Sequence, residues 1–298
     1  MKRRNTIVFL TAIICILFTV LLILRNTATA EEGFQTEGTV PKKIWTYWDS
    51  KDTVPDILNT CVDSWRKYNP DYEIILVYKD TVGDYVDIPD TLKTHPNFTD
   101  TRSRYADLVR LFLLEKYGGI WMDMSCIMYQ PLDDWLPKTD FFCFTYDQGR
   151  KNHPFPILEN WFIAVKPQHP FIQAWKKEFL EIQSFPSVKE YVASRRKMGV
   201  DISTIEHMAD YLAMHVGAQK ILQIDKYDSQ TLTMRETSQP GGPFWFLIKN
   251  GWNADKGIEE ACENPDLRKP FLKFHGPSRD VFLKRFKTDM TNEKCHWF

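Results

Sequence analysis

The pattern of apolar and polar positions divides the first part of the chain into alternating strands and helices. Apolar runs at residues 42–48 and 72–78 are typical of strands, whereas residues 55–70 repeat apolar side chains at helical spacing and end at Asn69-Pro70. The order strand, helix, strand predicts a βαβ unit and a parallel sheet. The expected fold class is therefore α/β.

A second helix is predicted over residues 99–119, and it leads directly into a short strand. Thr99 or Asp100 can cap its start, and Gly118 can provide a left-handed residue at its end. The strand "IWMD" then ends on Asp123. Because ligands of open α/β sheets bind beyond the carboxyl ends of strands, Asp123 is expected at a ligand-binding edge.

The remaining apolar runs predict three more strands and two more helices. The strands are expected at residues 126–132, 141–146 and 160–167, and the helices at residues 169–183 and 204–222. His207 and His215 lie two turns apart on the last helix, about 12 Å, which is too far to share a metal ion.

The N-terminal segment differs from the rest of the chain. Residues 7–24 are apolar and uncharged, and three basic residues precede them. This length is just sufficient to cross a bilayer, and the basic residues place the N-terminus in the cytosol. We expect a cytosolic tail at residues 1–6, a transmembrane signal anchor at 7–25, a polar stem at 26–40 and a folded domain at 41–298. A cleaved signal peptide is the alternative, because "ATA" at residues 28–30 has the small-x-small form.

Composition and cysteine spacing narrow the possible functions. The chain has 298 residues, 43% hydrophobic and 26% charged, which is typical of a globular protein, and its net charge of -1 gives no basic field for nucleic acid. No CxxC pair is present, so zinc-site spacing is absent.

Cys262 and Cys295 are the pair expected to form a disulfide in an oxidising lumen. Residues 97–99, "NFT", form an N-glycosylation sequon that is expected in a polar loop.

Several common catalytic motifs are missing from the sequence. It contains no GxGxxG, GxxxxGK[ST], HExxH or GxSxG segment. Hydride-transfer enzymes, P-loop NTPases, zinc peptidases and nucleophile-elbow hydrolases therefore lose their usual sequence support.

Three charged residues lie on one face of the helix predicted at residues 99–119. Arg104, Asp107 and Arg110 are spaced three residues apart, and their helix leads to Asp123. A solvated row of surface charges would give the same pattern, so the face alone does not define a site.

The segment "RYADLVRLFLLEKYGGIWMDMS" resembles the S-D-x-x-R-x-x-x-L-x-x-x-G-G-x-x-x-D-x-D segment of sugar-nucleotide transferases with the GT-A fold. These include the capsular polysaccharide synthesis protein family, the fungal initiating mannosyltransferases and the large clostridial glucosylating toxins. "PKKIWTYWDS" resembles their opening strand, and "ENWFIAVKPQHP" resembles a later strand and turn. The match runs from Pro41 to about Pro170. It is most similar to the capsular polysaccharide synthesis family, whose members often have D-A-T in place of D-x-D.

This resemblance implies a GT-A glycosyltransferase domain over residues 41–298. Its activity would be transfer of a hexose from a UDP- or GDP-hexose to a glycan or polysaccharide acceptor, with retention of configuration. An external domain that uses nucleotide sugars implies a single-pass type II protein of the Golgi or another secretory membrane, or of the bacterial inner membrane if the chain is prokaryotic.

The resemblance also assigns roles to residues. Trp48 would stack on the base, Asp107 would bind ribose or sugar hydroxyls, Arg110 would contact the sugar or phosphates, and Arg104 is a further donor-binding candidate. Asp123 would bind Mn²⁺ or Mg²⁺, which would bridge the diphosphate and act as a Lewis acid.

Ser125 is the departure from D-x-D, because a neutral hydroxyl replaces the second carboxylate. Metal binding would then rest on Asp123, Ser125, the diphosphate and a later residue. His275 in "KFHGPS" is the candidate, and an ordinary turn histidine is the alternative. A catalytically inactive sugar-binding or partner subunit and a metal-independent transferase both remain open.

Two other pairs of neighbouring polar residues can be compared with this site. Asp133 and Asp134 suit a polar turn better than a second acidic site. Glu159 and Asn160 precede a strand near the expected cleft, where contact with substrate and a structural role are equally open.

Overall fold

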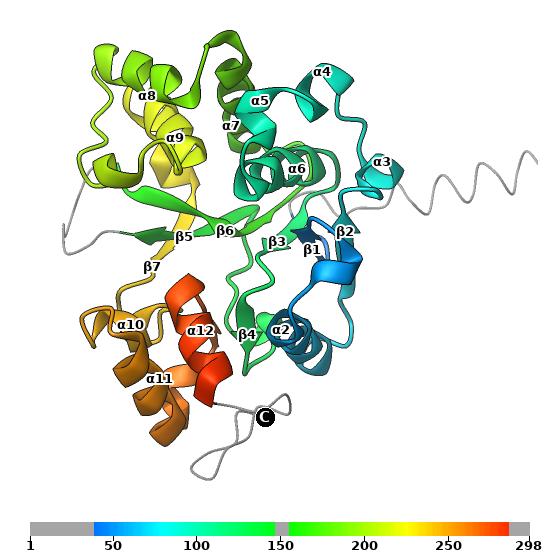
Figure 1. Cartoon of the computed structure of the whole chain (residues 1–298), viewed down its shortest axis with the longest axis vertical. Helices are drawn as coiled ribbons and strands as arrows, with labels where there is room; N and C mark the ends of the chain where they lie inside the picture. The colour runs from blue at the N-terminus through cyan, green and yellow to red at the C-terminus, as the bar shows by residue number, and fades with distance from the viewer. Residues whose placement is uncertain (1–38, 147–154, 286–298) are drawn as a thin grey trace, which may run out of the picture. The chain divides into compact units, whose positions relative to one another are not determined.

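A six-stranded mixed sheet lies at the centre of the computed structural model, which describes residues 39–146 and 155–285 (Figure 1). Its strands are β1 (Lys43–Trp48), β2 (Glu73–Tyr78), β3 (Gly119–Met122), β5 (Phe141–Tyr146), β6 (Ile157–Val165) and β7 (Thr233–Glu236). They are ordered β2-β1-β3-β6-β5-β7. β1 runs parallel to β2 and β3, whereas β6 is antiparallel to β3 and β5. The α/β class and the parallel βαβ unit are thus confirmed.

A small second sheet lies beside the central one. It pairs β4 (Cys126–Met128) with β8 (Phe271–Lys273) in antiparallel register, so that Cys126 faces Lys273. Two segments far apart in the sequence therefore meet directly after Asp123.

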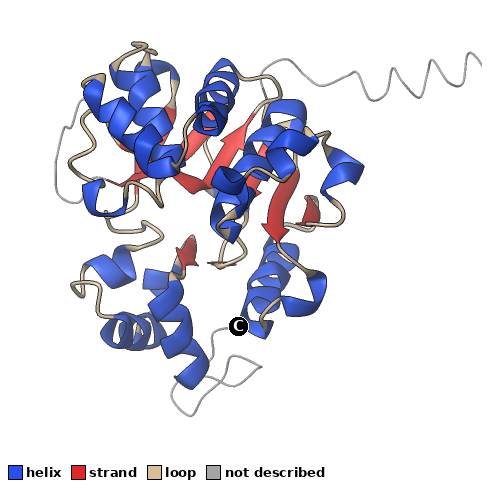
Figure 2. Ribbon diagram, turned by 45° about the horizontal axis from the view of Figure 1, so that its top comes forward, coloured by secondary structure: helices blue, strands red, loops and turns tan. Residues whose placement is uncertain are grey.

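Helices cover both faces of the central sheet (Figures 1 and 2). They are α2 (Asp56–Tyr68), α3 (Val82–Tyr85), α4 (Asp90–Lys93), α5 (Pro96–Thr99), α6 (Arg102–Tyr117), α7 (Pro170–Leu180), α8 (Val188–Lys197), α9 (Ala213–Gln223), α10 (Trp245–Ile248), α11 (Ala254–Glu263) and α12 (Gly276–Arg285). One apolar cluster joins α6, α7, α8 and α9 to the sheet, and a second joins α2, α10, α11 and α12 to its other face.

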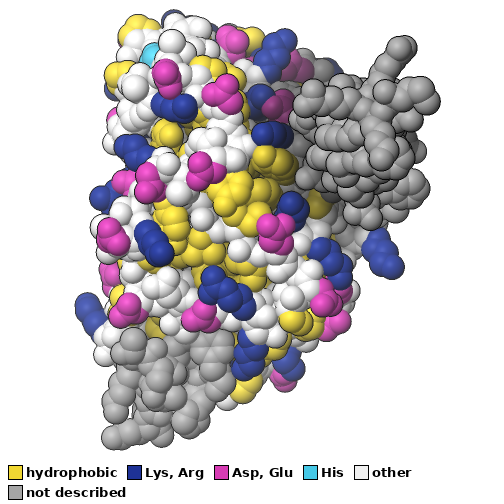
Figure 3. Space-filling view, turned by 90° about the vertical axis from the view of Figure 1, so that its right-hand side faces the viewer, with side chains coloured by type: hydrophobic (Ala, Val, Ile, Leu, Met, Phe, Trp, Pro, Cys, Tyr) yellow, Lys and Arg dark blue, Asp and Glu magenta, His cyan; other side chains and the backbone are white. Residues whose placement is uncertain are grey.

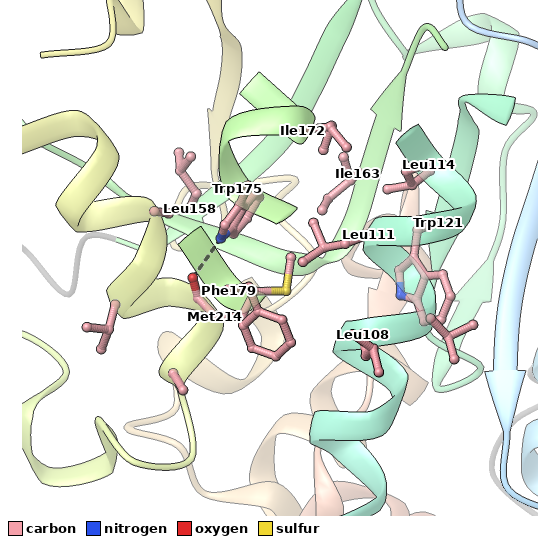
Figure 4. Packing of buried hydrophobic residues seen from close by; sticks show 14 of the residues in the cluster. Leu108, Leu111, Leu114, Trp121, Leu158, Ile163, Ile172, Trp175, Phe179 and Met214 are labelled. Atoms are coloured by element: carbon pink, nitrogen blue, oxygen red, sulfur yellow. Dashed lines mark hydrogen bonds between the residues drawn. The ribbon is translucent and has the colours of Figure 1, made fainter. Parts of the chain in front are cut away.

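Each face of the sheet has its own core because side chains alternate along a strand. In β3, Trp121 packs into the first cluster, whereas Ile120 and Met122 pack into the second. Figure 4 shows the first cluster between α6, α7 and α9, where the Trp175 indole N–H donates to the Met214 carbonyl at 2.7 Å. A strand buried on both faces reads as a continuous apolar run, which is the pattern seen in "IWM".

The helix predicted at residues 99–119 is present as α6, but its cap differs from the prediction. The Thr101 side chain accepts a hydrogen bond from the Arg104 backbone N–H, so Thr101 is the N-cap. Thr99 instead ends α5. The helix predicted at 204–222 is wrong in its first half, because α9 begins only at Ala213. Before it, the Asp210 carbonyl accepts from the Arg104 guanidinium of α6.

Three predictions about processing and the membrane meet different outcomes. Cys262 is disulfide-bonded, but its predicted partner Cys295 lies outside the described residues. Asn97 of the sequon is buried rather than in a polar loop, and its amide donates to the carbonyls of Ile182 and Phe185. The anchor expected at residues 7–25 lies outside the described residues, and within 39–146 and 155–285 no helix is long and apolar enough to span a bilayer.

The surface agrees with the balanced composition. On the face shown in Figure 3, basic and acidic side chains are interspersed over the described atoms. This mixture gives no single-sign field on that face.

Gly118 joins α6 to β3 at a position where only glycine fits. Its φ is +60°, and a Cβ there would lie 2.5 Å from the Pro167 nitrogen and 2.6 Å from the Val165 carbonyl oxygen. Gly199, by contrast, has φ +89° with open space around it.

We therefore expect Gly118→Ala to lower the free energy of unfolding by about 3 kcal/mol, from backbone strain together with the clash. The matched variant Gly199→Ala isolates the strain and should lower it by about 1 kcal/mol. Chemical unfolding of both variants checks this, and equal losses would show that the close approach at Gly118 is relieved without cost.

Candidate functional site

A cleft of about 470 Å³ opens at the carboxyl ends of β1 and β3. Because β1, β2 and β3 are parallel, these ends meet at one edge of the sheet. The cleft is lined from the sheet side by Trp48 and Asp123, from α6 by Asp107 and Arg110, and from the start of α12 by Gly276. The predicted ligand-binding edge thus borders a cleft in the structure.

Asp123 lies at the centre of this edge, one residue beyond β3. Its backbone N–H donates to the Trp161 carbonyl of β6 at 2.9 Å, and its own carbonyl accepts from the Cys126 N–H at 3.2 Å. On the other side of the turn, the Ser125 carbonyl accepts from the Phe274 N–H at 2.8 Å. The turn is therefore fixed by both sheets, and the Asp123 side chain, one-third exposed, faces the cleft.

Arg110 joins the two acidic residues of the site. Its guanidinium forms ion pairs with Asp107 and, at 3.2 Å, with Asp123 Oδ1, and it lies 4.5 Å from the centre of the Trp121 ring. Its side chain is only 4% exposed. Arg110 is therefore committed to organising the two carboxylates, and the charged face of α6 is buried at this point rather than solvated.

Asp107 is held from a second direction by β6. The Asn160 amide donates to Asp107 Oδ1 at 2.9 Å. Burial raises the pKa of Asp107 even though the Arg110 guanidinium opposes the change. Asn160, which the sequence left open between substrate contact and a structural role, thus orients Asp107 and also lines the cleft.

Lys273 is the second cation of the site. Its ammonium donates to Asp123 Oδ2 at 3.0 Å and to Ser125 Oγ at 2.6 Å, and its side chain is 10% exposed. Burial acts against both charges, but the ion pairs prevail: Lys273 and Arg110 hold the pKa of Asp123 below its usual value, and Asp123 raises the pKa of Lys273. Both groups are therefore ionised at neutral pH.

The donor set does not fit the divalent ion expected from the sequence. The two oxygens that would bind Mn²⁺ or Mg²⁺, Asp123 Oδ2 and Ser125 Oγ, already accept hydrogen bonds from the Lys273 ammonium. A divalent ion bound to these oxygens would lie beside the Lys273 ammonium, and the two positive charges would repel each other. Among the described residues, no three His, Cys, Asp or Glu side chains are grouped so that they could hold a metal.

Two other residues predicted for the site, Trp48 and His275, also lie at the cleft. Trp48 lines the cleft, with its indole N–H donating to the Thr53 carbonyl at 3.2 Å. His275 also lines the cleft, but its Nδ1 is hydrogen-bonded to Ser278 Oγ at 2.8 Å. Burial, together with Lys273 and Arg279, lowers the pKa of His275.

Two predicted charges lie outside the cleft. Arg104 forms an ion pair with Asp100 and does not line the cleft, so the structure separates it from Asp107 and Arg110. Asp133 belongs to a polar turn, as expected, where it is bonded to Lys42 and Tyr72.

Sequence reasoning missed Lys273, although a signal was present. The residue is the single charge in the apolar run 271–274, "FLKF", and all four of these residues are buried. A lone buried lysine needs a counter-ion, which points to an acidic residue elsewhere in the fold.

Comparison with known proteins identifies related sequences. The family model described as "Capsular polysaccharide synthesis protein" matches residues 24–194, more than half of the chain, and confirms the family expected from the motifs. The O-glycosyltransferase braB of Annulohypoxylon truncatum is 27% identical over 165 residues, which cover 48% of this chain and 38% of the relative. The initiation-specific alpha-1,6-mannosyltransferase of Saccharomyces cerevisiae is 25% identical over 122 residues, which cover 38% and 25%. The chain therefore spans well under half the length of these relatives.

Solved glycosyltransferase structures give weaker matches. The PaToxG glycosyltransferase aligns over 88% of this chain and 91% of its own, with a TM-score of 0.38 and 16% identity. The ligand-free glycosyltransferase domain of the YGT toxin aligns over 66% and 80%, with a TM-score of 0.41 and 10% identity.

Proposed function

Since the chain belongs to the capsular polysaccharide synthesis protein family, we propose that it is a glycosyltransferase that moves a hexose from a UDP- or GDP-hexose to a glycan acceptor. The observation that supports this most strongly is the pairing of two buried cations with two carboxylates in one cleft. Lys273 and Arg110 lie within the same group as Asp107 and Asp123. Sugar alone is uncharged, so a lectin gains little from buried cations, whereas a departing nucleoside diphosphate requires positive charge.

The proposed roles follow from these positions. Asp107, oriented by Arg110 and Asn160, accepts hydrogen bonds from hydroxyls of the donor. Trp48, at the end of β1, offers a ring face to the base. Asp123 holds the cations of the cleft in place. Retention of configuration is part of the proposal, and divalent metal is not, because the oxygens that would bind it are bonded to Lys273.

The proposal includes the location expected from the sequence. The apolar segment 7–25 would anchor a single-pass type II protein in a secretory membrane, or in the bacterial inner membrane if the chain is prokaryotic. The polar stem at 26–40 would then connect the anchor to the catalytic domain.

A donor panel tests this function. The full chain, purified in detergent, is incubated with UDP- and GDP-hexoses, including GDP-mannose because a mannosyltransferase is among the relatives, and nucleoside diphosphate release is measured. We expect release from one donor class, with a product anomer of the same configuration as the donor when followed by NMR. If no donor releases its nucleoside diphosphate while oligosaccharides still bind, the chain is instead a catalytically inactive sugar-binding subunit of the same fold.

A further inference from the structure

Lys273 occupies an unusual position for a lysine. It ends β8 opposite Cys126 of β4, within an apolar run whose neighbours Leu272 and Phe274 are fully or almost fully buried. A lysine in such surroundings normally extends its ammonium to water, yet this one extends it to Asp123 and Ser125. The fold therefore places a fixed positive charge on the floor of the cleft.

The Lys273 ammonium donates to one side-chain oxygen of Asp123 and to that of Ser125, the first and third residues of the D-x-S turn. Asp123 and Ser125 stand where a D-x-D turn presents two carboxylates to a divalent ion. Two carboxylates and a doubly charged cation sum to zero, and one carboxylate, one hydroxyl and an ammonium also sum to zero. Replacement of the second acid by Ser125 is thus matched by replacement of a dication by a monocation, and the local charge is unchanged.

The Lys273 ammonium and the Arg279 guanidinium can both bind a ligand in the cleft. An ammonium has three N–H bonds, and the described residues accept two of them from Lys273. Arg279, on α12, lines the same cleft and has no ion-pair partner within residues 39–146 and 155–285. Gly276 lies between these two residues at the N-terminus of α12, where the helix dipole also favours an anion.

We propose that the Lys273 ammonium takes the place of the divalent metal in this chain and, together with Arg279, binds the donor diphosphate. This deepens the proposed function and rests on it. In the transfer, the bond between sugar C1 and the diphosphate oxygen breaks, and its electron pair goes to that oxygen. The acceptor hydroxyl oxygen forms the new bond to C1, and its proton goes to the departing diphosphate. Lys273 neutralises the charge that develops on the diphosphate.

Metal dependence of nucleotide binding tests this inference without any mutation. UDP and GDP are titrated by calorimetry into the full chain in detergent, once with EDTA and once with MnCl₂. We expect one of them to bind with the same Kd in both conditions. Binding that appears only with Mn²⁺ would overturn the inference while leaving the proposed function intact. Absence of binding in both conditions would reject the proposed function, and this inference with it.

Variants then assign the effect to Lys273. Lys273→Met should weaken the diphosphate about 10- to 100-fold while the matching nucleoside, uridine or guanosine, binds as before. The control Lys256→Met removes an exposed lysine of α11 and should change neither. Equal weakening of nucleoside and diphosphate would show a structural role and overturn the assignment.

A double variant offers a test by gain of function. Ser125→Asp with Lys273→Ser creates the second carboxylate and removes the ammonium, so diphosphate binding should become dependent on Mn²⁺. Thermal unfolding shows whether the variant is folded. A folded double variant that binds the diphosphate in EDTA as tightly as the native chain would contradict the inference.

Discussion

Asp123→Asn is expected to reduce donor turnover by about 10³-fold, the loss typical when a preorganised electrostatic group is removed from an active site. Asp123 receives N–H donors on both oxygens: Arg110 and Trp121 on Oδ1, and Lys273 on Oδ2. An asparagine of the same shape must turn its NH₂ group toward one of these donors. The variant therefore both loses the negative charge and misplaces a cation of the cleft.

The control for this prediction is Asp133→Asn. Asp133 is also acidic and paired with a lysine, but it is half-exposed and lies in a turn away from the cleft. Turnover of the donor found in the panel should be unchanged in this variant. If the turnover of Asp123→Asn is within a few-fold of that of the native chain, Asp123 does not take part in the proposed catalysis.

Arg110→Met is expected to lower the free energy of unfolding by about 3 kcal/mol. The change leaves Asp107 without its cation while the carboxylate remains buried, and breaking one partner of a buried pair is strongly destabilising. Asp123 loses less, because it is one-third exposed and retains Lys273. Urea unfolding followed by tryptophan fluorescence measures the loss.

Arg196→Met is the matched control for Arg110→Met. Its guanidinium pairs with Glu206 on the surface, where the two side chains are 45% and 60% exposed. Exposed pairs contribute at most about 1 kcal/mol, so this variant should unfold almost as the native chain does. Equal losses of unfolding free energy in the two variants would show that the buried pair stabilises the fold no more than the exposed pair does.

The first half of the fold could be predicted because its elements have strong local patterns. α2 repeats its apolar residues at helical spacing, β1, β2 and β3 are apolar runs, and Gly118 marks the end of α6. Asp123 could be placed at a ligand edge because parallel strands bring their carboxyl ends together. The D-x-S turn and the helix with Asp107 and Arg110 were therefore recognised as one site.

The second half could not be predicted in the same way. α10 and the strands β7 and β8 are only three or four residues long, too short for a periodic signal. The contact that completes the site joins Lys273 to Asp123 across 150 residues, and no local pattern specifies such a pairing. The resemblance favours His275 in the same segment, although Lys273, two positions before it, is the residue that reaches the turn.

The central claim is that the donor binds where β3, α6 and the start of α12 meet. Hydrogen–deuterium exchange of the full chain, with and without the nucleoside diphosphate that binds, tests it most directly. The claim predicts slower exchange in peptides covering residues 123–126 and 273–279, with no change in the α8 segment 189–196, which lines a different hollow. Protection confined to α8, or unchanged exchange at both cleft segments while the nucleotide is bound, would contradict it.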